Sequence, residues 1–135
     1  MKVLVLTSET VTAQQLRDAL GGNVADAEVM VVAPALHESR LRFLLSDADE
    51  AIAKADAVRR ETVENLGDAG VPAAGDTGES DPLKAVEDTL REFDADRIVV
   101  FTRPAGEQRH REGVDERELE QRFGRPVEHA LVPSS

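Results

Sequence analysis

Five short apolar runs divide the sequence, and the segments between them carry apolar residues every three to four positions. The runs are "VLVL" at 3–6, "AEVMVVA" at 27–33, "VPAAG" at 71–75, "RIVVF" at 97–101 and "VEHALV" at 127–132. Short apolar runs are typical of buried strands, whereas a period of about 3.6 residues is typical of amphipathic helices. Helices that join consecutive strands force those strands to run parallel. The pattern therefore predicts an α/β fold, a doubly wound, five-stranded parallel sheet flanked by helices.

The first predicted helix, 12–20, has signals at both of its ends. Thr12 and Gln15 have the spacing of a capping box, and the pair Gly21 and Gly22 is a stop signal. The expected buried stripe of this helix is Leu16, Ala19 and Leu20.

Three more helices are predicted from the same period. One covers 38–67 and ends at Gly67 and Gly70, and another covers 115–123 and stops at Gly124. The third begins at Pro82 with Asp81 as its cap, because proline fits the first turn of a helix. Its expected buried residues are Leu83, Val86, Leu90 and Phe93.

Two of the five predicted strands have features of sheet edges. "VPAAG" contains Pro72, and "VEHALV" contains Glu128 and His129, which edge strands tolerate better than central strands. No linker, repeat or low-complexity tract interrupts the pattern, so residues 1–135 are expected to form a single domain.

Composition narrows the classes of function. The formal net charge of −11 would repel a phosphodiester backbone, so we expect no nucleic-acid partner. The absence of cysteine excludes disulfides, thiolate catalysis and Cys-ligated zinc. The N-terminal apolar run is too short for a signal peptide, and no apolar run could span a bilayer. We therefore expect a cytoplasmic protein without membrane association.

A ligand of such a sheet would lie outside the carboxyl ends of the strands, at the point where the strand order reverses. The segments that follow the predicted strands are 7–10, 34–38, 76–80 and 102–113. The candidate binding residues in this crevice are Thr7, Ser8, Pro34, Thr102, Arg103, Gly106 and Arg109.

The passage "GDTGESDPLKAVEDTLREFDADRIVV" and the final "RPVEHALV", together with the layout of five strand–helix units, resemble the universal stress protein family. The resemblance covers nearly the whole chain. It implies a Rossmann-like fold of the adenine nucleotide alpha hydrolase type, and a homodimer that forms through the last strand, 127–132. It also implies a role in stress response or regulation.

The signature residues of nucleotide-binding members of the family are missing. Their motif, G-x2-G-x9-G-[S/T], falls here on Thr102, Ala105 and the pair Asp115-Glu116, and their Asp after the first strand is replaced by Ser8 and Glu9. Asp115 and Glu118 have the spacing of a capping box, so a carboxylate would occupy the amide donors that a phosphate needs. The sequence therefore predicts a degenerate nucleotide motif and no cofactor.

The loop after the fourth predicted strand leaves an alternative open. Arg103, Arg109, His110 and Arg111 form its basic cluster, and guanidinium groups bind phosphate bidentately. These residues would either bind ATP, another nucleotide or an anionic metabolite, or form surface ion pairs with Glu107 and Glu112.

Other chemistries have weaker support. "TSETVT" at 7–12 lacks the residues of a flavodoxin phosphate loop, and His37, His110 and His129 do not have metal-ligand spacing. No nucleophile elbow, P-loop or SGG-x-D pyrophosphatase signature is present. We expect a non-catalytic protein without a metal, which acts by association with itself or with a protein partner.

Overall fold

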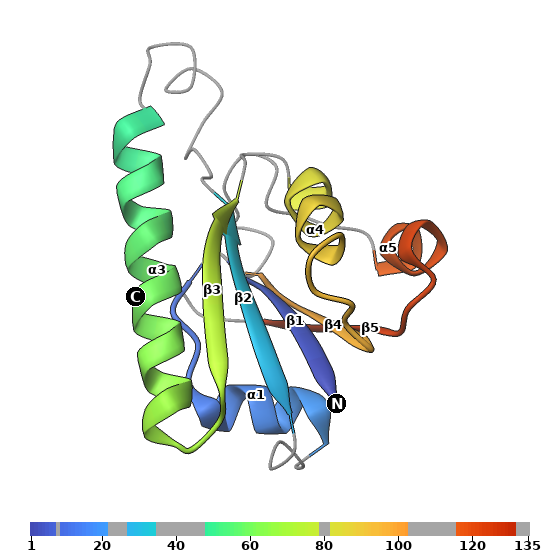
Figure 1. The fold of residues 1–135 in the computed structure, drawn as a ribbon, viewed down its shortest axis with the longest axis horizontal. Coiled ribbons are helices and arrows are strands. Elements are labelled where there is room, and N and C mark those ends of the chain that lie inside the picture. Colours follow the sequence, from blue (N-terminus) through green and yellow to red (C-terminus); the bar gives the residue numbers. More distant parts are fainter. Residues whose placement is uncertain (8, 22–26, 35–47, 79–81, 103–115, 132–135) are drawn as a thin grey trace.

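The computed structural model describes residues 1–7, 9–21, 27–34, 48–78, 82–102 and 116–131. This part of the chain forms a five-stranded parallel sheet in the order β3-β2-β1-β4-β5 (Figure 1). The strands are β1 (Lys2–Thr7), β2 (Glu28–Pro34), β3 (Ala73–Gly78), β4 (Arg97–Thr102) and β5 (Val127–Leu131). The described helices are α1 (Ala13–Leu20), α3 (Ala48–Asp68), α4 (Pro82–Leu90) and α5 (Glu116–Phe123). The predicted α/β fold is confirmed, and β3 and β5 are the two edges.

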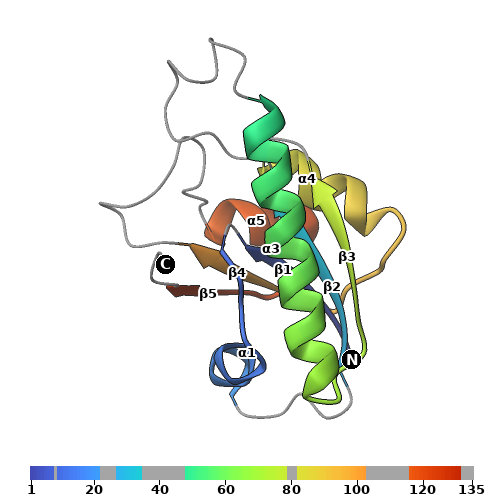
Figure 2. The same cartoon turned by 90° about the vertical axis from the view of Figure 1, so that its left-hand side faces the viewer.

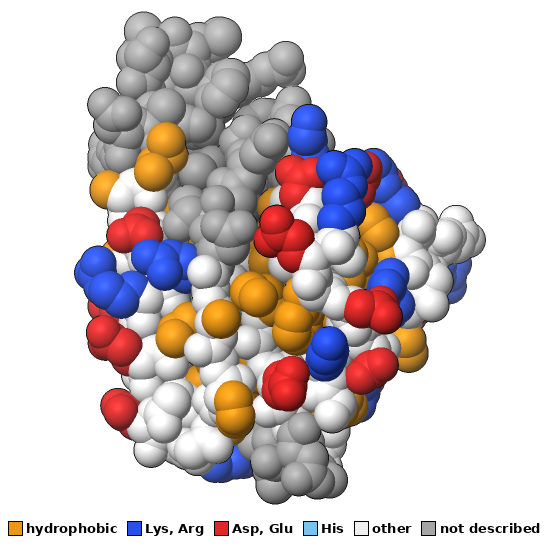
Figure 3. All heavy atoms as spheres, viewed as in Figure 1, with side chains coloured by type: hydrophobic (Ala, Val, Ile, Leu, Met, Phe, Trp, Pro, Cys, Tyr) orange, Lys and Arg blue, Asp and Glu red, His pale blue; other side chains and the backbone are white. Residues whose placement is uncertain are grey.

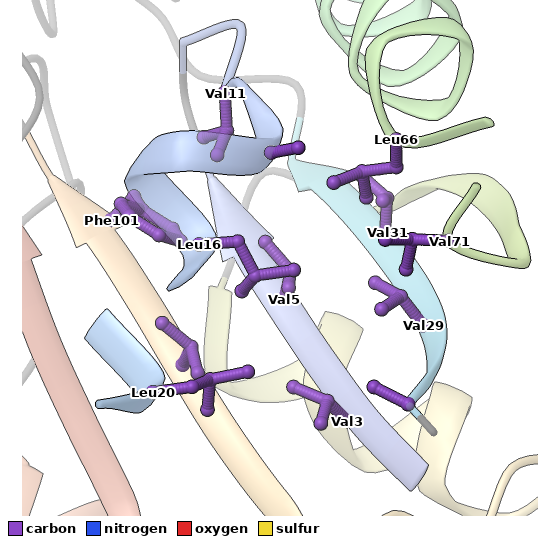
Figure 4. Packing of buried hydrophobic residues seen from close by; sticks show 13 residues of the cluster. Val3, Val5, Val11, Leu16, Leu20, Val29, Val31, Leu66, Val71 and Phe101 are labelled. Atoms are coloured by element: carbon purple, nitrogen blue, oxygen red, sulfur yellow. The ribbon is translucent and has the colours of Figure 1, made fainter. Parts of the chain in front are cut away.

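The sheet has an apolar core on each face. Side chains alternate along β1, so Val3 and Val5 contact α1 and α3, whereas Leu4 and Leu6 contact α4 and α5 (Figures 1 and 2). Figure 4 shows Leu16 of α1 together with side chains of β1 and β4 in the first of these cores. Because β1 is covered on both faces, its sequence is a continuous apolar run, as parallel strands require.

Helix α1 has the ends that the sequence predicts. Thr12 is its N-cap, with both bonds of a capping box to Gln15, and Gly21 is its C-cap in the left-handed conformation with φ of 81°. Leu16 and Leu20 are buried beneath the helix, and Ala19 is half-buried at the rim of the same core. Full burial of a leucine stabilises a fold by about 1.5–3 kcal/mol.

Helix α3 lies along β2 and β3. Ala55 and Val58 pack on Ala33 of β2, and Leu66 near the other end of the helix is fully buried in the first core. The predicted helix covered 38–67. Residues 48–67 are helical, and residues 38–47 lie outside the described part of the chain.

Strand β3 differs from its prediction. We expected it at 71–75, but it begins at Ala73 and continues to Gly78. The amide of Val71 donates to the carbonyl of Leu66, 2.9 Å away, so this residue closes the end of α3 instead of pairing with β2. Asp76, the first residue of the segment that we expected to follow this strand, is opposite Val32 in the sheet.

Helices α4 and α5 are joined at the surface by an ion pair. The Arg122 guanidinium of α5 donates to Glu87 of α4 at 2.7 Å, and Arg91 contacts the same carboxylate at 3.1 Å. The hydrogen bond from Arg122 lowers the pKa of the Glu87 carboxyl below its ordinary value. Figure 3 shows acidic and basic side chains side by side over these helices. Beneath them Val86 is buried as predicted, whereas Leu90 and Phe93 are only half-buried, and the side chain of Leu83 lies outside the described part of the chain. Asp81 lies outside the described residues.

Candidate functional site

The strand order reverses between β1 and β4, so the candidate site lies at their carboxyl ends. The chain leaves β1 toward β2 on one side and leaves β4 toward β5 on the other. In the sheet Thr7 is paired with Phe101, the residue before Thr102. A crevice at such a point is where open α/β sheets bind their ligands.

Three of the seven candidate residues lie at these strand ends. Thr7, Pro34 and Thr102 are the last residues of β1, β2 and β4, which are neighbours in the sheet. We expected them just after the strands, but each strand extends to include its candidate residue. The other four lie outside the described residues, and their participation stays a prediction: Ser8, Arg103, Gly106 and Arg109.

Thr7 closes the turn that follows β1. Its hydroxyl donates to the carbonyl of Glu9 at 2.6 Å and accepts from the amide of Glu9 at 3.2 Å. The Thr7 residue is 1% exposed. A hydroxyl that makes both of these local bonds is already committed within the turn, which weakens its case as a ligand-binding group.

Glu9 and Lys54 form an ion pair at the same end of the sheet. Lys54 of α3 reaches the Glu9 carboxylate at 3.3 Å, and the glutamate side chain is only 7% exposed whereas the lysine side chain is 45% exposed. A buried carboxylate requires such a partner, because an isolated charge is costly to remove from water. Because the two charges cancel, the pair adds no net positive charge at this end of the sheet that would attract an anionic ligand.

This ion pair was not predicted from the sequence. Glu9 was recognised only as a departure from the family motif, and Lys54 was not singled out. The residues are 45 positions apart, and helical periodicity alone does not reveal which strand end a helix faces. The scarcity of lysine, with Lys2, Lys54 and Lys84 alone in the sequence, was the one available signal.

Helix α3 also fixes the next part of the turn. The buried hydroxyl of Thr62 accepts from the amide of Val11 at 3.1 Å, and Asn65 donates to the carbonyl of Val11 at 3.2 Å. At the surface the hydroxyl of Thr10 donates to Glu61 at 3.1 Å. Two elements far apart in the sequence, α3 and the segment between β1 and α1, are thus joined.

Side chains therefore occupy a series of backbone donors between β1 and α1. The amides of Glu9, Val11, Thr12 and Gln15 donate to Thr7, Thr62, Gln15 and Thr12, respectively. Phosphate sites at helix N-termini depend on amides that are open to the ligand. These four amides are not open, because each has a partner within the protein.

The second half of the crevice, residues 103–115, lies outside the described part of the chain. The arginine cluster, His110 and the proposed cap at Asp115 therefore stay predictions. His37 also lies outside it, and His129 is exposed on β5. Among the described residues, no three histidine, cysteine or acidic side chains converge in a way that could hold a metal ion. No described helix is both long and apolar enough to cross a membrane.

Comparison with known proteins adds a structural likeness. No protein-family model matches the sequence, and no curated protein matches it. Among solved structures, the chain is similar to a protein of the universal stress protein family from Burkholderia pseudomallei, with a TM-score of 0.51 and 19% sequence identity. The match covers 98% of this chain and 96% of the other. The chain therefore has a universal-stress-protein-like fold, as its sequence motifs predict.

Proposed function

We propose that the protein is a non-catalytic, cytoplasmic domain of universal stress protein type that does not hold ATP. It acts in stress response or regulation by association with a second copy of itself or with another protein. The turn between β1 and α1 is the observation that supports this proposal most directly. Its hydroxyl and amide groups bond within the protein, and the buried charge beside it is a carboxylate paired with lysine.

Association fits the open edge of β5. Within the described part of the chain β5 is the last strand of the sheet and pairs with β4. Glu128 of this strand is paired with Arg97 of β4, which reduces the local charge in an otherwise acidic chain. An unpaired strand edge is a template for another strand, and pairing two such edges satisfies both.

Thermal denaturation with nucleotides tests the proposal. We expect the unfolding midpoint to stay constant when ATP, ADP, AMP or inorganic phosphate is added up to millimolar concentration. A ligand at a hundred times its dissociation constant would stabilise the protein by about 2.7 kcal/mol. A rise that grows with ligand concentration would contradict the proposal and favour binding through the arginine-rich loop.

A matched pair of variants would locate such a binding site. If ATP raises the midpoint, replacement of Arg103 and Arg109 by alanine should abolish the rise. The control replaces Arg60 of α3 and Arg91, the residue after α4, by alanine. Both arginines are exposed, so this double variant also loses two positive charges. An equal loss in both double variants would indicate a general electrostatic effect and no specific site.

A further inference from the structure

The two faces of the sheet are covered unevenly at β3. On one face Ala73 packs on the core that also contains Leu66 of α3. Side chains alternate along a strand, so Ala74 points to the opposite face, and there it is exposed. Parallel strands are normally covered by helices on both faces. At Ala74 the described part of the chain therefore lacks one of the two layers that such a strand requires.

Apolar side chains extend from Ala74 toward α4. Met30 of β2 is opposite Ala74 in the sheet and is half-buried. Leu90 at the end of α4 and Phe93 beyond it are also half-buried, and they pack with Met30 on the core beneath α4 and α5. Figure 3 shows apolar side chains at the surface between α3 and α4, where β3 and β2 lie in Figure 1. We name the surface of Met30, Ala74, Leu90 and Phe93 the β3 patch.

Two basic groups close to the β3 patch already have partners. Lys2 Nζ lies 5.7 Å from the centroid of the Phe93 ring, a distance at which a cation is attracted to an aromatic face. The Arg91 guanidinium contacts Glu87 at 3.1 Å and Asp88 at 3.4 Å. These two cations therefore do not give the patch a positive character.

Two acidic groups close to the patch have no such partner. Glu28 is the first residue of β2 and lies on the same face as Met30, two residues further along the strand. Glu92 lies in the turn between Leu90 and Phe93. Both glutamates are exposed, and neither forms an ion pair with another described residue. The uncompensated charge beside the patch is therefore negative.

This charge distinguishes between possible occupants of the patch. A second copy of the chain would bring the same carboxylates and a net charge of −11 to a surface of the same sign, so its approach would be repelled. A basic partner would be attracted over a long range and could pair with Glu28 and Glu92 once docked. A positively charged protein segment therefore fits the patch better than a second copy does.

The length of β3 sets the size of that segment. The six residues of β3 span about 20 Å. An α-helix of the same length has about 13 residues. Helices are the elements that cover parallel strands, and a helix that lies at the surface of a protein is apolar on one side and polar on the other.

We propose that the β3 patch binds an amphipathic helix of a partner protein. Its apolar side would face Met30 and Ala74, and its lysine or arginine residues would lie near Glu28 and Glu92. The helix would lie beside α4 and add the missing layer over β3. This inference rests on the proposed association with another protein, and it adds the face that is used and the chemistry of the partner.

Methyl NMR with a model helix tests the inference, because the chain has only two methionines, Met1 and Met30. The probe is a synthetic peptide of about 14 residues with leucine on one side of the helix and lysine on the other. Protein labelled with carbon-13 at the methionine methyl groups should show a saturable change in the Met30 signal as the peptide is added. Met30→Leu assigns that signal. A peptide in which glutamate replaces each lysine should leave the signal unchanged.

A lysine introduced into the patch should repel the probe. Ala74→Lys should raise the dissociation constant of the lysine peptide at least about ten-fold, because it adds bulk and positive charge where the helix docks. Ala53→Lys is the matched control, because Ala53 is exposed on α3, which covers the other face of the sheet. We expect the control to change the dissociation constant by less than about two-fold. Circular dichroism verifies that both variants are folded.

A milder pair of variants keeps the shape of the patch. Glu28→Gln should weaken binding of the lysine peptide by about two- to five-fold, because it removes one charge that the helix would pair with. Glu64→Gln, at an exposed position of α3, changes the net charge by the same amount and should have a smaller effect. Equal effects of the two substitutions would show that the peptide responds to the net charge of the chain and would overturn the inference.

Three further results would overturn the inference and leave the proposed function standing if light scattering gives a dimer. The Met30 signal could stay constant with the lysine peptide up to millimolar concentration, or it could respond equally to the glutamate peptide. It could also change with protein concentration alone, which would place a second copy at the patch. A retained adenine nucleotide would instead refute the proposed function, whatever the Met30 signal shows.

Discussion

Gly75 of β3 lies against the side chain of Arg59 on α3. A Cβ atom at this position would be 2.5 Å from Arg59 Cγ and 3.0 Å from Val63 Cγ2. The guanidinium of Arg59 is paired with Asp56, so the near end of the arginine stem cannot move away without disturbing that pair. The absence of a side chain at Gly75 thus allows α3 to approach β3 closely.

Gly75→Ala should therefore destabilise the protein by about 1–3 kcal/mol, as over-packing does elsewhere. Gly67→Ala is its control, because a Cβ there would have no neighbour within 4 Å and its backbone is helical. The control should stabilise α3 by about 0.4–1 kcal/mol. Urea denaturation measures both free energies of unfolding, and equal effects of the two substitutions would show that the contact with Arg59 is unimportant.

A second residue-scale prediction concerns the buried hydroxyl of Thr62. Thr62→Val would leave the amide of Val11 without its acceptor in a buried setting, and should cost about 1–3 kcal/mol in free energy of unfolding. Thr62→Ser keeps the hydroxyl and should retain most of that stability. Thr10→Val removes an exposed bond to Glu61 and should change stability by less than about 0.5 kcal/mol. If Thr62→Val costs no more than Thr10→Val, the attachment of the turn to α3 is weaker than the geometry indicates.

At the scale of elements, the surface contact between α4 and α5 should depend on pH. The pKa of Glu87 is lowered in the folded protein, chiefly by its hydrogen bond with Arg122. The ionised Glu87 carboxylate therefore stabilises the folded protein fully above the ordinary pKa of glutamate. This stabilisation is lost as the pH falls through the lowered pKa of Glu87 in the folded state. Arg122→Leu should lower the urea midpoint at pH 7, and the difference from the unmodified protein should shrink toward about pH 3.

The control for this prediction is Arg60→Leu on α3, an exposed arginine that contacts Asp56 at 3.7 Å. Its effect on the urea midpoint reports the loss of one surface charge without the Glu87 bond. A difference for Arg122→Leu that stays constant from pH 7 to about pH 3 would contradict the role given to Glu87.

Local patterns predicted the elements well where each signal lies within a few residues. The capping box of α1, its left-handed Gly21 and the edge positions of β3 and β5 all follow from short motifs. The start of β3 was predicted wrongly. An apolar residue such as Val71 is equally compatible with a buried strand and with the buried turn that closes α3. The sequence alone does not decide between those two uses.

The candidate site was less predictable than the elements. The placement of Thr7, Pro34 and Thr102 at neighbouring strand ends was predicted correctly, because parallel strands bring their carboxyl ends together, and their part in ligand binding stays a prediction. The contacts of Lys54, Thr62 and Asn65 with the turn after β1 were not predicted, because α3 is 45 or more positions away in the sequence. Such contacts depend on how a helix is placed over the sheet, which periodicity does not specify.

At the scale of the whole molecule, the fold is similar to that of a universal stress protein structure, whereas the function has to be inferred from the candidate site. The likeness to a universal stress protein structure extends over 98% of the chain at 19% identity. One fold can support several functions, so the filled turn at the crevice and the open edge of β5 bear on function more directly than the likeness does.

Mass spectrometry under non-denaturing conditions tests the central claim most directly. The protein, purified without added nucleotide, should give a charge series at twice the chain mass of 14.6 kDa, with no additional bound mass. A species that retains the mass of an adenine nucleotide for each chain would contradict the account, because it would show that the crevice accepts a phosphate after all.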